Sequence, residues 1–548
     1  MASSSLLLLL LFAVVVAVTS AAAAGQKNSL VRCLATATKD PNIASIVYTP
    51  STPSFSKILT SYIRNRRFNT SSASKPTTIL TPKTPSHVSA VVTCAKSLNL
   101  RLRIRSGGHD YDGLSYISEN AANHFVLLDM FNFRNITVDL KNEIAWAGAG
   151  ATLGELYYSI AAQSKVHAFP AGICPTVAVG GHLSGGGYGN MLRKFGLSVD
   201  QVVDAQIVDA KGRILNRKSM GEDLFWAING GGGASYGVVL GYKIKLVRVP
   251  ETVSVFRIER WIDDKATDIF AKWHQIAYDI DSNLFIRTLV QPVTPKKKAN
   301  GAKANKSKTI RLTFISLYLG DSDSLVSLTD KEFPELGLTK NDVQEMNWIQ
   351  SVLFWNNNNN MTSSPKELLD RNLAGNDIKF LKRKSDYVQS PMSKENLQLM
   401  WNKMIELGKT GLVFNQYGGR MAEIPATATP FPHRAGNIFK IQYSINWDEE
   451  GAEAENKYLS QIRELYKFNA PFMSKNPRGA FLNYRDVDIG ENQHKSRNES
   501  YKEGEVYGRK YFLKNFQRLV KVKTAVDPDD FFSYGQSIPV LTADSHEY

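Results

Sequence analysis

The chain has 548 residues, of which 43% are hydrophobic and 10% aromatic, and it carries a formal net charge of +15. This length exceeds what one hydrophobic core normally serves, so we expect two domains, and the composition excludes a disordered protein. Much of the positive charge comes from lysine clusters at 296–308, in a Gly/Ala/Asn-rich stretch typical of an exposed loop.

The first 24 residues have the pattern of a secretory signal. An apolar run from Leu6 to Val18 is followed by small residues as far as Ala24. The run is too short to span a bilayer, and no later stretch is long enough, so we expect no membrane span. We therefore expect an exported protein beginning near Gly25, located in the apoplast or cell wall rather than the vacuole.

Export limits the binding partners that the positive net charge of the protein can attract. Nucleic-acid binding is a poor inference for an exported chain, whereas loose association with an acidic wall polysaccharide fits the charge. We expect a monomer. Five Asn-X-Ser/Thr sequons, at Asn69, Asn135, Asn305, Asn360 and Asn498, are consistent with a glycoprotein.

Three cysteines agree with an oxidising compartment, where two would pair and one would remain. Cys33 and Cys94 lie in helix-like sequence without glycine nearby, whereas Cys174 lies among glycines. We expect a structural disulfide between Cys33 and Cys94, with Cys174 as the odd thiol.

Short strands broken by glycines are predicted from Thr78 to about Pro250. In chain order the strands are 100–104, 125–128, 136–140 and 144–147, and a helix over 153–163 follows. Thr152 and Glu155 have the spacing of a capping box at the start of that helix. Gly148 and Gly150 resemble a dinucleotide fingerprint, but the third glycine falls one position late and no βαβ pattern surrounds it, so we reject a Rossmann domain.

Longer elements follow Pro250. Strands are expected at 252–262, 284–293, 309–319 and 438–447, and amphipathic helices at 263–280, 341–355, 393–407, 451–466 and 505–523. This order predicts an antiparallel sheet with helices packed on it, that is, a second domain of α+β type.

Three glycine clusters lie in the first part of the chain, at 107–108, 180–189 and 230–233. One cluster alone would be a flexible turn, but three favour a backbone cradle for phosphate and a planar ring. His109 follows the first cluster and Cys174 precedes the second. Each alone is more often structural or inert than functional, yet together they indicate a cofactor gripped, and even bonded, by both loops.

The surrounding motifs resemble the berberine bridge enzyme-like family of plant flavoproteins. Arg105-Ser-Gly-Gly-His-Asp110 is similar to the family's histidyl-flavin motif, and Phe169-Pro-Ala-Gly-Ile-Cys-Pro-Thr176 to its cysteinyl-flavin motif. Other similar blocks are 223–228, 429–436, 483–486 and 536–539, so the resemblance covers about Cys33 to Pro539.

The resemblance implies an α+β fold of the vanillyl-alcohol-oxidase/PCMH type. Its FAD-binding domain would comprise residues 25–250 and a returning C-terminal segment, 481–548, with an α+β substrate domain inserted at 251–480. FAD would be attached bicovalently, through its 8α carbon to His109 and through C6 to Cys174. The implied cofactor contacts are Arg105, Ser106, Gly107, Gly108, Val177, Gly180, Gly181, Ser184, Gly185, Gly186 and Gly187. We expect no metal.

The resemblance also places Tyr484, Lys440, Tyr188, Gln442 and Tyr111 over the flavin. Tyr484 would be the base that removes a hydroxyl proton, and Lys440 would lower its pKa as a neighbouring cation. From spacing alone each tyrosine would be a packing residue.

Position 442 discriminates within the family, because Gln442 cannot accept a proton where the alkaloid ring-closing members have a glutamate base. Val177 matches the position that gates oxygen access and resembles the oxygen-reactive members. Asn229 and Ala178 depart from the family's usual arginine and glycine, which bears on flavin packing.

These features predict a secreted FAD-linked oxidase acting on CH–OH groups with release of hydrogen peroxide. The substrate is a monolignol-type allylic alcohol, oxidised to an aldehyde, or the anomeric hydroxyl of a sugar or oligosaccharide, oxidised to a lactone. The alternatives are a flavin dehydrogenase with an acceptor other than oxygen, and a non-catalytic wall glycoprotein.

Overall fold

The computed structural model describes residues 28–70, 73–118, 124–295, 307–356, 363–372, 378–494 and 496–541. The expected signal at 1–24, most of the lysine-rich stretch, and the sequons at Asn305 and Asn360 lie outside these ranges. Within them, no helix is both long and apolar enough to cross a membrane.

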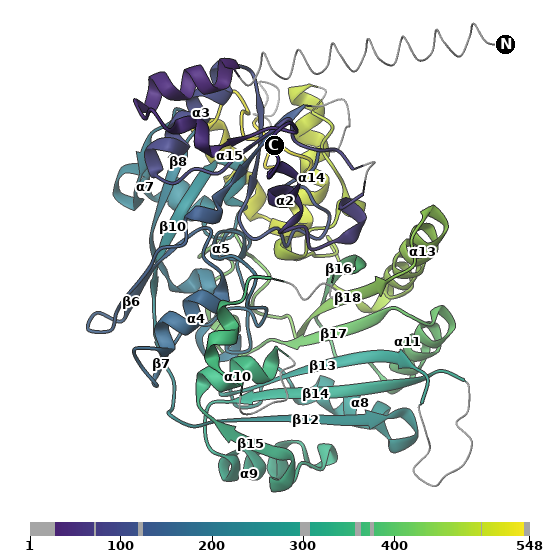
Figure 1. The fold of residues 1–548 in the computed structure, drawn as a ribbon. Coiled ribbons are helices and arrows are strands. Elements are labelled where there is room, and N and C mark those ends of the chain that lie inside the picture. The colour runs from purple at the N-terminus through teal and green to yellow at the C-terminus, as the bar shows by residue number, and fades with distance from the viewer. Residues whose placement is uncertain are drawn as a thin grey trace, which may run out of the picture.

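Two sheets form the upper half of the molecule in Figure 1. The first has the strand order β1-β2-β4-β3 and consists of β1 (Val47–Tyr48), β2 (Thr78–Leu80), β3 (Arg101–Arg105) and β4 (Phe125–Asp129). The second has the order β5-β6-β10-β8-β9 and consists of β5 (Ile136–Asp139), β6 (Ile144–Gly148), β8 (Val202–Asp209), β9 (Ile214–Leu215) and β10 (Gly237–Lys245). A short pair joins β7 (His167–Ala168) to β11 (Val247–Arg248).

A seven-stranded sheet forms the lower half, with the order β15-β12-β14-β13-β17-β18-β16, and its neighbours pair antiparallel. Its strands are β12 (Val253–Trp261), β13 (Leu284–Val293), β14 (Thr309–Tyr318), β15 (Val343–Met346), β16 (Phe380–Val388), β17 (Gly411–Gln416) and β18 (Phe439–Trp447). The expected α+β class with a large antiparallel sheet is confirmed.

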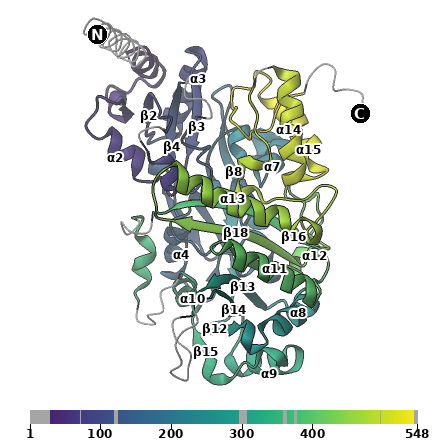
Figure 2. The ribbon, with the colours of Figure 1, turned by 90° about the vertical axis from the view of Figure 1, so that its right-hand side faces the viewer.

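Helices cover one face of the seven-stranded sheet, and other helices lie beside the two sheets of the upper half (Figure 2). Those beside the upper sheets are α2 (Phe55–Thr60), α3 (Pro85–Ser97), α4 (Leu153–Ala161), α5 (Val179–Ser184), α7 (Arg217–Ile228), α14 (Arg497–Phe512) and α15 (Asn515–Val526). The short helix α6 (Leu192–Phe195) instead packs on β13 of the seven-stranded sheet. Those of the lower half are α8 (Ala266–Ile276), α9 (Ser322–Glu332), α10 (Trp348–Trp355), α11 (Lys394–Leu407), α12 (Arg420–Glu423) and α13 (Ala452–Phe468). The helices α8, α11 and α13 bury Trp273, Trp401 and Leu465 against the sheet, in one apolar cluster.

The chain returns to the upper half after the seven-stranded sheet. In Figure 1 the yellow helices α14 and α15 lie among the purple and blue elements, and α15 packs on α7. The domain limits at 250 and 480 stay predictions.

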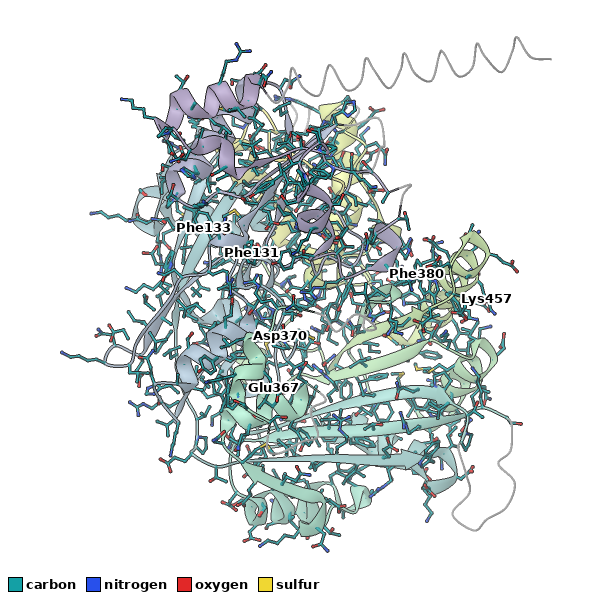
Figure 3. The ribbon with its side chains drawn as sticks, viewed as in Figure 1. Phe131, Phe133, Glu367, Asp370, Phe380 and Lys457 are labelled. Atoms are coloured by element: carbon teal, nitrogen blue, oxygen red, sulfur yellow. A yellow bond between two sulfur atoms is a disulfide. The ribbon has the colours of Figure 1, made fainter. Side chains whose placement is uncertain are left out.

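A short segment of the lower half also reaches the upper half. The 3-10 helix Pro365–Leu369 packs on α4, and Arg371 pairs with Glu155 of the confirmed capping box at 3.0 Å. Figure 3 labels Glu367 and Asp370 in this segment, and the guanidinium of the following Arg371 lies 4.8 Å from the Phe131 ring centroid. The segment therefore ties the two halves together beside the cysteine loop that follows α4.

The disulfide between Cys33 and Cys94 is present, with a Cα–Cα distance of 5.8 Å, as expected. Both cysteines lie in helices, within residues 28–38 and in α3.

Two helix predictions were wrong in extent. The segment expected as one helix over 341–355 contains β15, which pairs with β12, and then α10, which Asn347 caps by accepting a hydrogen bond from Gln350. The helix expected over 505–523 is two helices, because Leu513 has a φ of +48° and ends α14.

Candidate active site

A cavity of about 490 Å³ lies between the two halves, in the size range of small-molecule sites. One wall is made by the glycine loops after β3 and around α5, and the opposite wall by strands of the seven-stranded sheet. The segment that contains Tyr484 also lines the cavity, as do Gly232 and Gly233 of the third glycine cluster.

The two loops that carry His109 and Cys174 meet at this cavity. His109 Nε2 lies 3.0 Å from Oγ1 of Thr176, two residues after the cysteine. Burial lowers the pKa of His109 to about 3, so the imidazole is neutral at physiological pH. Cys174 is a free thiol exposed to the cavity. Because protein encloses the cavity, desolvation still raises the pKa of this thiol.

Glycines let these loops pack against each other and leave room above them. A Cβ on Gly107 would lie 2.7 Å from the backbone nitrogen of Ala178, and one on Gly180 would lie 2.7 Å from Oγ of Ser106. A Cβ on Gly181 would meet nothing within 4 Å, although this residue lines the cavity. The glycines at 107 and 180 thus serve loop contact, whereas Gly181 faces open space.

Most of the predicted site residues line the cavity. They are Ser106, Gly107, Gly108, His109, Tyr111, Cys174, Val177, Gly180, Gly181, Ser184, Gly185, Tyr188, Gln442 and Tyr484. Gly186 and Gly187 do not line it, and the Gly187 N–H donates to Asn483 Oδ1 at 3.0 Å. Asn483 in turn donates to the Gly181 carbonyl, so the residue before Tyr484 holds the glycine run in place.

Arg105 was expected to contact the cofactor, but it lies outside the cavity lining. Its guanidinium is fully buried, pairs with Asp129 at 2.6 Å and donates to the carbonyls of Leu59 and Ile58. Its place is structural, because these partners neutralise its charge inside the core.

Three tyrosines converge in the cavity. The hydroxyls of Tyr188 and Tyr484 share a hydrogen bond, and their rings meet edge to face with centroids 6.0 Å apart. The Tyr111 ring centroid lies 5.7 Å from that of Tyr484, and Gln442 Nε2 donates to the Tyr111 hydroxyl at 3.1 Å. Burial raises the pKa of Tyr484 well above its ordinary value, and the two neighbouring tyrosines raise it further.

Lys440 is buried beside these rings, and its ammonium group lies against ring faces. Its Nζ lies 2.9 Å from the Tyr188 ring centroid and 4.5 Å from that of Tyr484, and it has no hydrogen-bond partner among the described residues. Burial, and then the nearby Arg287, lower the pKa of Lys440 well below its ordinary value, which weakens it as a source of positive charge.

Two arginines that the sequence analysis did not identify line the cavity. Arg287 of β13 approaches the Tyr188 hydroxyl at 3.5 Å and donates to Asn415 at 2.8 Å. It is the cation that opposes the increase in the pKa of Tyr484. Arg383 of β16 lies 5.6 Å from the Tyr111 ring centroid. An arginine inside the apolar strand 284–293 was the available signal for Arg287, whereas β16 was not predicted.

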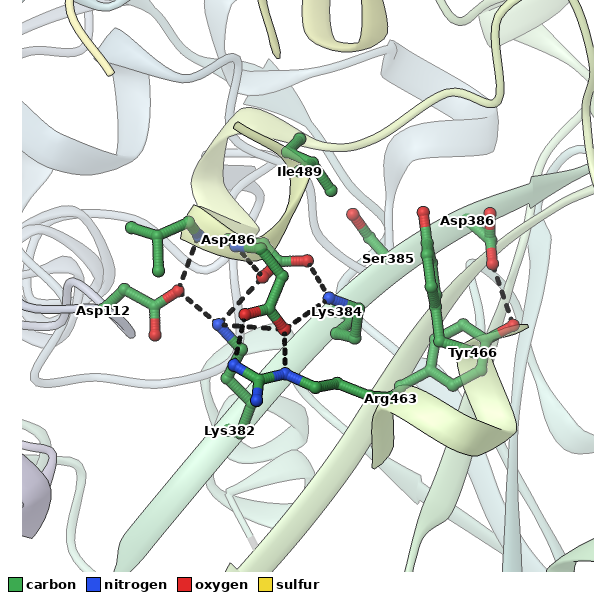
Figure 4. A network of polar contacts seen from close by, with 12 residues as sticks. Asp112, Lys382, Lys384, Ser385, Asp386, Arg463, Tyr466, Asp486 and Ile489 are labelled. Atoms are coloured by element: carbon green, nitrogen blue, oxygen red, sulfur yellow. Dashed lines mark hydrogen bonds and ion pairs between the residues drawn. The ribbon is translucent and has the colours of Figure 1, made fainter. Parts of the chain in front are cut away.

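A buried ionic network holds the tyrosine-bearing segments (Figure 4). Lys382 of β16 pairs with Asp112 at 2.6 Å and with Asp486 at 2.8 Å, and Lys384 pairs with Asp486 at 2.6 Å and Asp488 at 2.9 Å. Asp112 directly follows Tyr111, and Asp486 lies two residues after Tyr484. The network therefore fastens both tyrosine segments to the edge strand of the sheet.

Two family models match the chain. One is described as an FAD binding domain and covers residues 76–217, and the other, described as berberine and berberine like, covers residues 480–539. The first range contains both His109 and Cys174, and the second contains Tyr484. Fold and site together are those of an FAD-linked oxidoreductase.

Relatives identify the family. The chain is 58% identical to berberine bridge enzyme-like 19 of Arabidopsis thaliana, over 94% of this chain and 88% of that protein. It is also 58% identical to berberine bridge enzyme-like 21 of the same plant, over 94% of this chain and 93% of that one. The chain belongs to the berberine bridge enzyme-like family.

Solved structures agree with this assignment. Berberine bridge enzyme from Eschscholzia californica has a TM-score of 0.85 and 35% identity, covering 93% of this chain and 99% of that one. Phl p 4, described as a grass pollen allergen with glucose dehydrogenase activity, has a TM-score of 0.87 and 39% identity over 93% of this chain and 99% of that one.

The residues of the cavity fit an FAD. A free thiol and a neutral imidazole line the cavity, and a Cβ on Gly181, which also lines it, would meet nothing within 4 Å. Glycine-rich backbone of this kind suits the close approach of a planar ring.

Proposed function

We propose that this protein is a secreted FAD-linked oxidase that oxidises the anomeric hydroxyl of a sugar or oligosaccharide to a lactone and reduces oxygen to hydrogen peroxide. A monolignol-type allylic alcohol, oxidised to an aldehyde, is the second candidate substrate. One observation carries the proposal: the hydrogen-bonded pair of Tyr188 and Tyr484 faces the same cavity as His109 and Cys174.

FAD is bound bicovalently in this proposal, through its 8α carbon to His109 and its C6 to Cys174. When bound it supplies the acceptor for the hydride of the substrate's carbinol carbon. The neutral imidazole of His109 supports this, because a nitrogen that must form a bond to carbon cannot carry a proton there. Asn483 supports it as well, because its hydrogen bond to the Gly181 carbonyl holds this glycine in place at the cavity wall.

Tyr484 accepts the proton of the substrate hydroxyl. The base is its phenolate, which the hydrogen bond with Tyr188 positions and which becomes a neutral phenol when it takes the proton. Arg287, which contacts the Tyr188 hydroxyl, stabilises the negative charge of that phenolate. Lys440 adds packing and partial charge against the ring faces rather than a contact to oxygen. Gln442 orients Tyr111 and cannot act as a base, which speaks against alkaloid ring closure.

A sugar is favoured over the allylic alcohol by the solved relatives. Phl p 4 is described as having glucose dehydrogenase activity. The polar side chains of Gln442 and Ser444 line the cavity on the side of the sheet and can bind sugar hydroxyls.

Oxygen as the acceptor is supported by Val177, which lines the cavity at the family's gating position. Wild-type Phl p 4 is described as a glucose dehydrogenase, and its variant with valine in place of an isoleucine as a glucose oxidase. Secretion and glycosylation belong to the proposal too, and Asn69, Asn135 and Asn498 are exposed, as glycan attachment requires.

Anaerobic stopped-flow mixing with sugars and with allylic alcohols tests the proposal. We expect a sugar to bleach the flavin absorbance, and admitted air to restore it with one peroxide per flavin. Slow reoxidation in air would indicate a dehydrogenase, and purified protein without colour would indicate a non-catalytic wall glycoprotein.

A further inference from the structure

The two loops that would hold the flavin are connected by one side-chain hydrogen bond. His109 Nε2, in the loop after β3, lies 3.0 Å from Oγ1 of Thr176, in the loop that carries Cys174. Within the described residues the imidazole makes this hydrogen bond and none through Nδ1. The proposed reaction gives Thr176 no task, although Cys174 and Val177 on either side of it line the cavity.

The backbone around Thr176 is held by the start of a helix. The carbonyls of its two neighbours, Pro175 and Val177, accept hydrogen bonds from the N–H groups of Gly154 at 2.9 Å and Leu153 at 2.8 Å. Both donors belong to the first turn of α4, whose N–H groups have no acceptor within the helix. The Thr176 side chain is therefore presented from a fixed backbone.

The backbone around His109 is fixed as well. The preceding residue, Gly108, has a φ of +66°, and a Cβ there would collide with the carbonyl of Tyr62. Glycine allows both this conformation and this close approach. The hydrogen bond between the imidazole and the hydroxyl thus joins two rigid loops.

This hydrogen bond favours one tautomer of His109. A neutral imidazole carries its proton on one nitrogen and a lone pair on the other, and the partner of one nitrogen selects the tautomer. With the proton on Nε2, the ring donates to Thr176 Oγ1 and Nδ1 keeps its lone pair. The opposite tautomer would place an N–H on Nδ1, for which the described part of the chain offers no acceptor. Nδ1 is therefore the nucleophilic nitrogen.

A hydroxyl suits this position because its role can reverse. When Nδ1 is bonded to carbon, Nε2 of the neutral ring carries a lone pair instead of a proton. The Thr176 hydroxyl can accept from the Nε2–H group before that bond forms and donate to the Nε2 lone pair afterwards, whereas a carboxylate could only accept. One side chain thus stabilises both the free and the alkylated imidazole.

We propose that Thr176 is a positioning residue for the attachment of the flavin to His109: its hydroxyl holds Nε2, so that Nδ1 bonds to the 8α carbon. The inference rests on the proposed function and adds a residue to it. In the attachment step one C–H bond of the 8α methyl group breaks, its carbon bonds to Nδ1, and the electron pair of the C–H bond reduces the ring. The protons released from the methyl group and from Nε2 balance the two that the reduced ring takes up. Oxygen then reoxidises the ring and gives hydrogen peroxide.

Peptide mapping of the purified holoenzyme tests the inference, because it reports attachment at His109 and at Cys174 separately. The protein is digested, and mass spectrometry locates FAD on the peptides that contain these two residues. For the wild type we expect FAD linked to both. Thr176→Val should lower the linked fraction of His109 to about a tenth of the wild-type value, because Nε2–H loses its acceptor, while Cys174 stays linked.

Further variants separate positioning from a general effect on the fold. Thr176→Ser keeps the hydroxyl and should restore the linkage at His109. Thr288→Val is the matched control, because Thr288 is buried on β13, does not line the cavity, and has a hydroxyl without a hydrogen-bond partner among the described residues. Its linkage should equal that of the wild type. The double variant Cys174→Ala/Thr176→Val should be yellow when native but lose its flavin on acid precipitation.

Two results would overturn the inference: a wild-type linked fraction of His109 in Thr176→Val, or a wild-type linkage through Nε2, which NMR of the flavin peptide distinguishes from one through Nδ1. In both cases the flavin is attached, so the proposed function stands without the inference. A wild-type protein without linked flavin would remove the proposed function as well. The linkage nitrogen of the wild type tests the inference even where Thr176→Val does not fold.

Discussion

Tyr188 and Tyr484 are 296 residues apart in the chain and share a hydrogen bond between their hydroxyls. One comes from the glycine-rich loop beside the cysteine and the other from the returning C-terminal segment. The proposed proton acceptor, Tyr484, therefore obtains its hydrogen-bond partner only in the folded protein, and the residues around it determine how it titrates.

Removal of the phenol hydroxyl at 484 should slow substrate oxidation. Tyr484→Phe keeps the ring contacts with Phe481 and Tyr111 but cannot accept a proton. We expect the anaerobic rate of flavin reduction to fall by about a hundredfold or more, a typical general-base contribution. An unchanged rate would assign the base to another residue. The flavin spectrum of the variant serves as the control for folding.

The rate should also rise with pH. Burial raises the pKa of Tyr484, so the deprotonated form is scarce at neutral pH and its population increases about tenfold per pH unit below that pKa. We expect flavin reduction to accelerate from pH 6 to pH 9 without a plateau. Arg287→Met removes the cation that opposes the increase in pKa, so its rate at pH 8 should be lower and its profile displaced to higher pH. A flat profile in the wild type would contradict this.

The buried ionic network should contribute to stability. Lys384→Met would leave Asp486 and Asp488 short of a cation in a buried site, and breaking a buried pair in this way costs about 3–5 kcal/mol. We expect a marked decrease in the midpoint of urea unfolding. The control is Arg217→Met, which breaks an exposed pair with Glu222 and should cost about 1 kcal/mol or less. Equal effects of the two substitutions would mean that the buried network contributes no more to stability than an exposed ion pair.

Mild acid should destabilise the fold through buried histidines. Burial lowers the pKa of His182 to about 3 and that of His274 and His433 to about 4, against about 6.5 in the unfolded chain. Between these values the unfolded state binds more protons, so the free energy of unfolding falls as pH decreases below 6.5. The loss is up to about 1.4 kcal/mol per histidine and pH unit. Urea unfolding at pH 7, 6 and 5 measures it, and stability that rises on acidification would contradict it.

The sequence predicted some elements closely because their determinants are local. The strand 284–293 was expected with the bounds that it has, and the capping box of Thr152 and Glu155 is formed. The paired cysteines and the convergence of the two flavin motifs were also expected. A motif, however, predicts which loop binds the cofactor but not which of its side chains reach the cavity. Arg105 was therefore predicted to contact the cofactor, although it is buried in the core and pairs with Asp129.

What was missed depends on tertiary partners. The strand β16 contains Lys382, Arg383 and Lys384 in succession, which reads as a solvated stretch until Asp112, Asp486 and Asp488 are brought to it from distant segments. Arg383 was not predicted as a cavity residue because it lies in the middle of this charged stretch. The break at Leu513 has no glycine or proline to mark it, and a long helix was therefore expected.

The proposed function depends on attachment of the flavin to both loops, which acid precipitation followed by washing with organic solvent can test. We expect a yellow pellet for the wild type and for Cys174→Ala, where His109 keeps the flavin, and a white pellet for the variant lacking both side chains. A white wild-type pellet, with all the flavin in the supernatant, would contradict it.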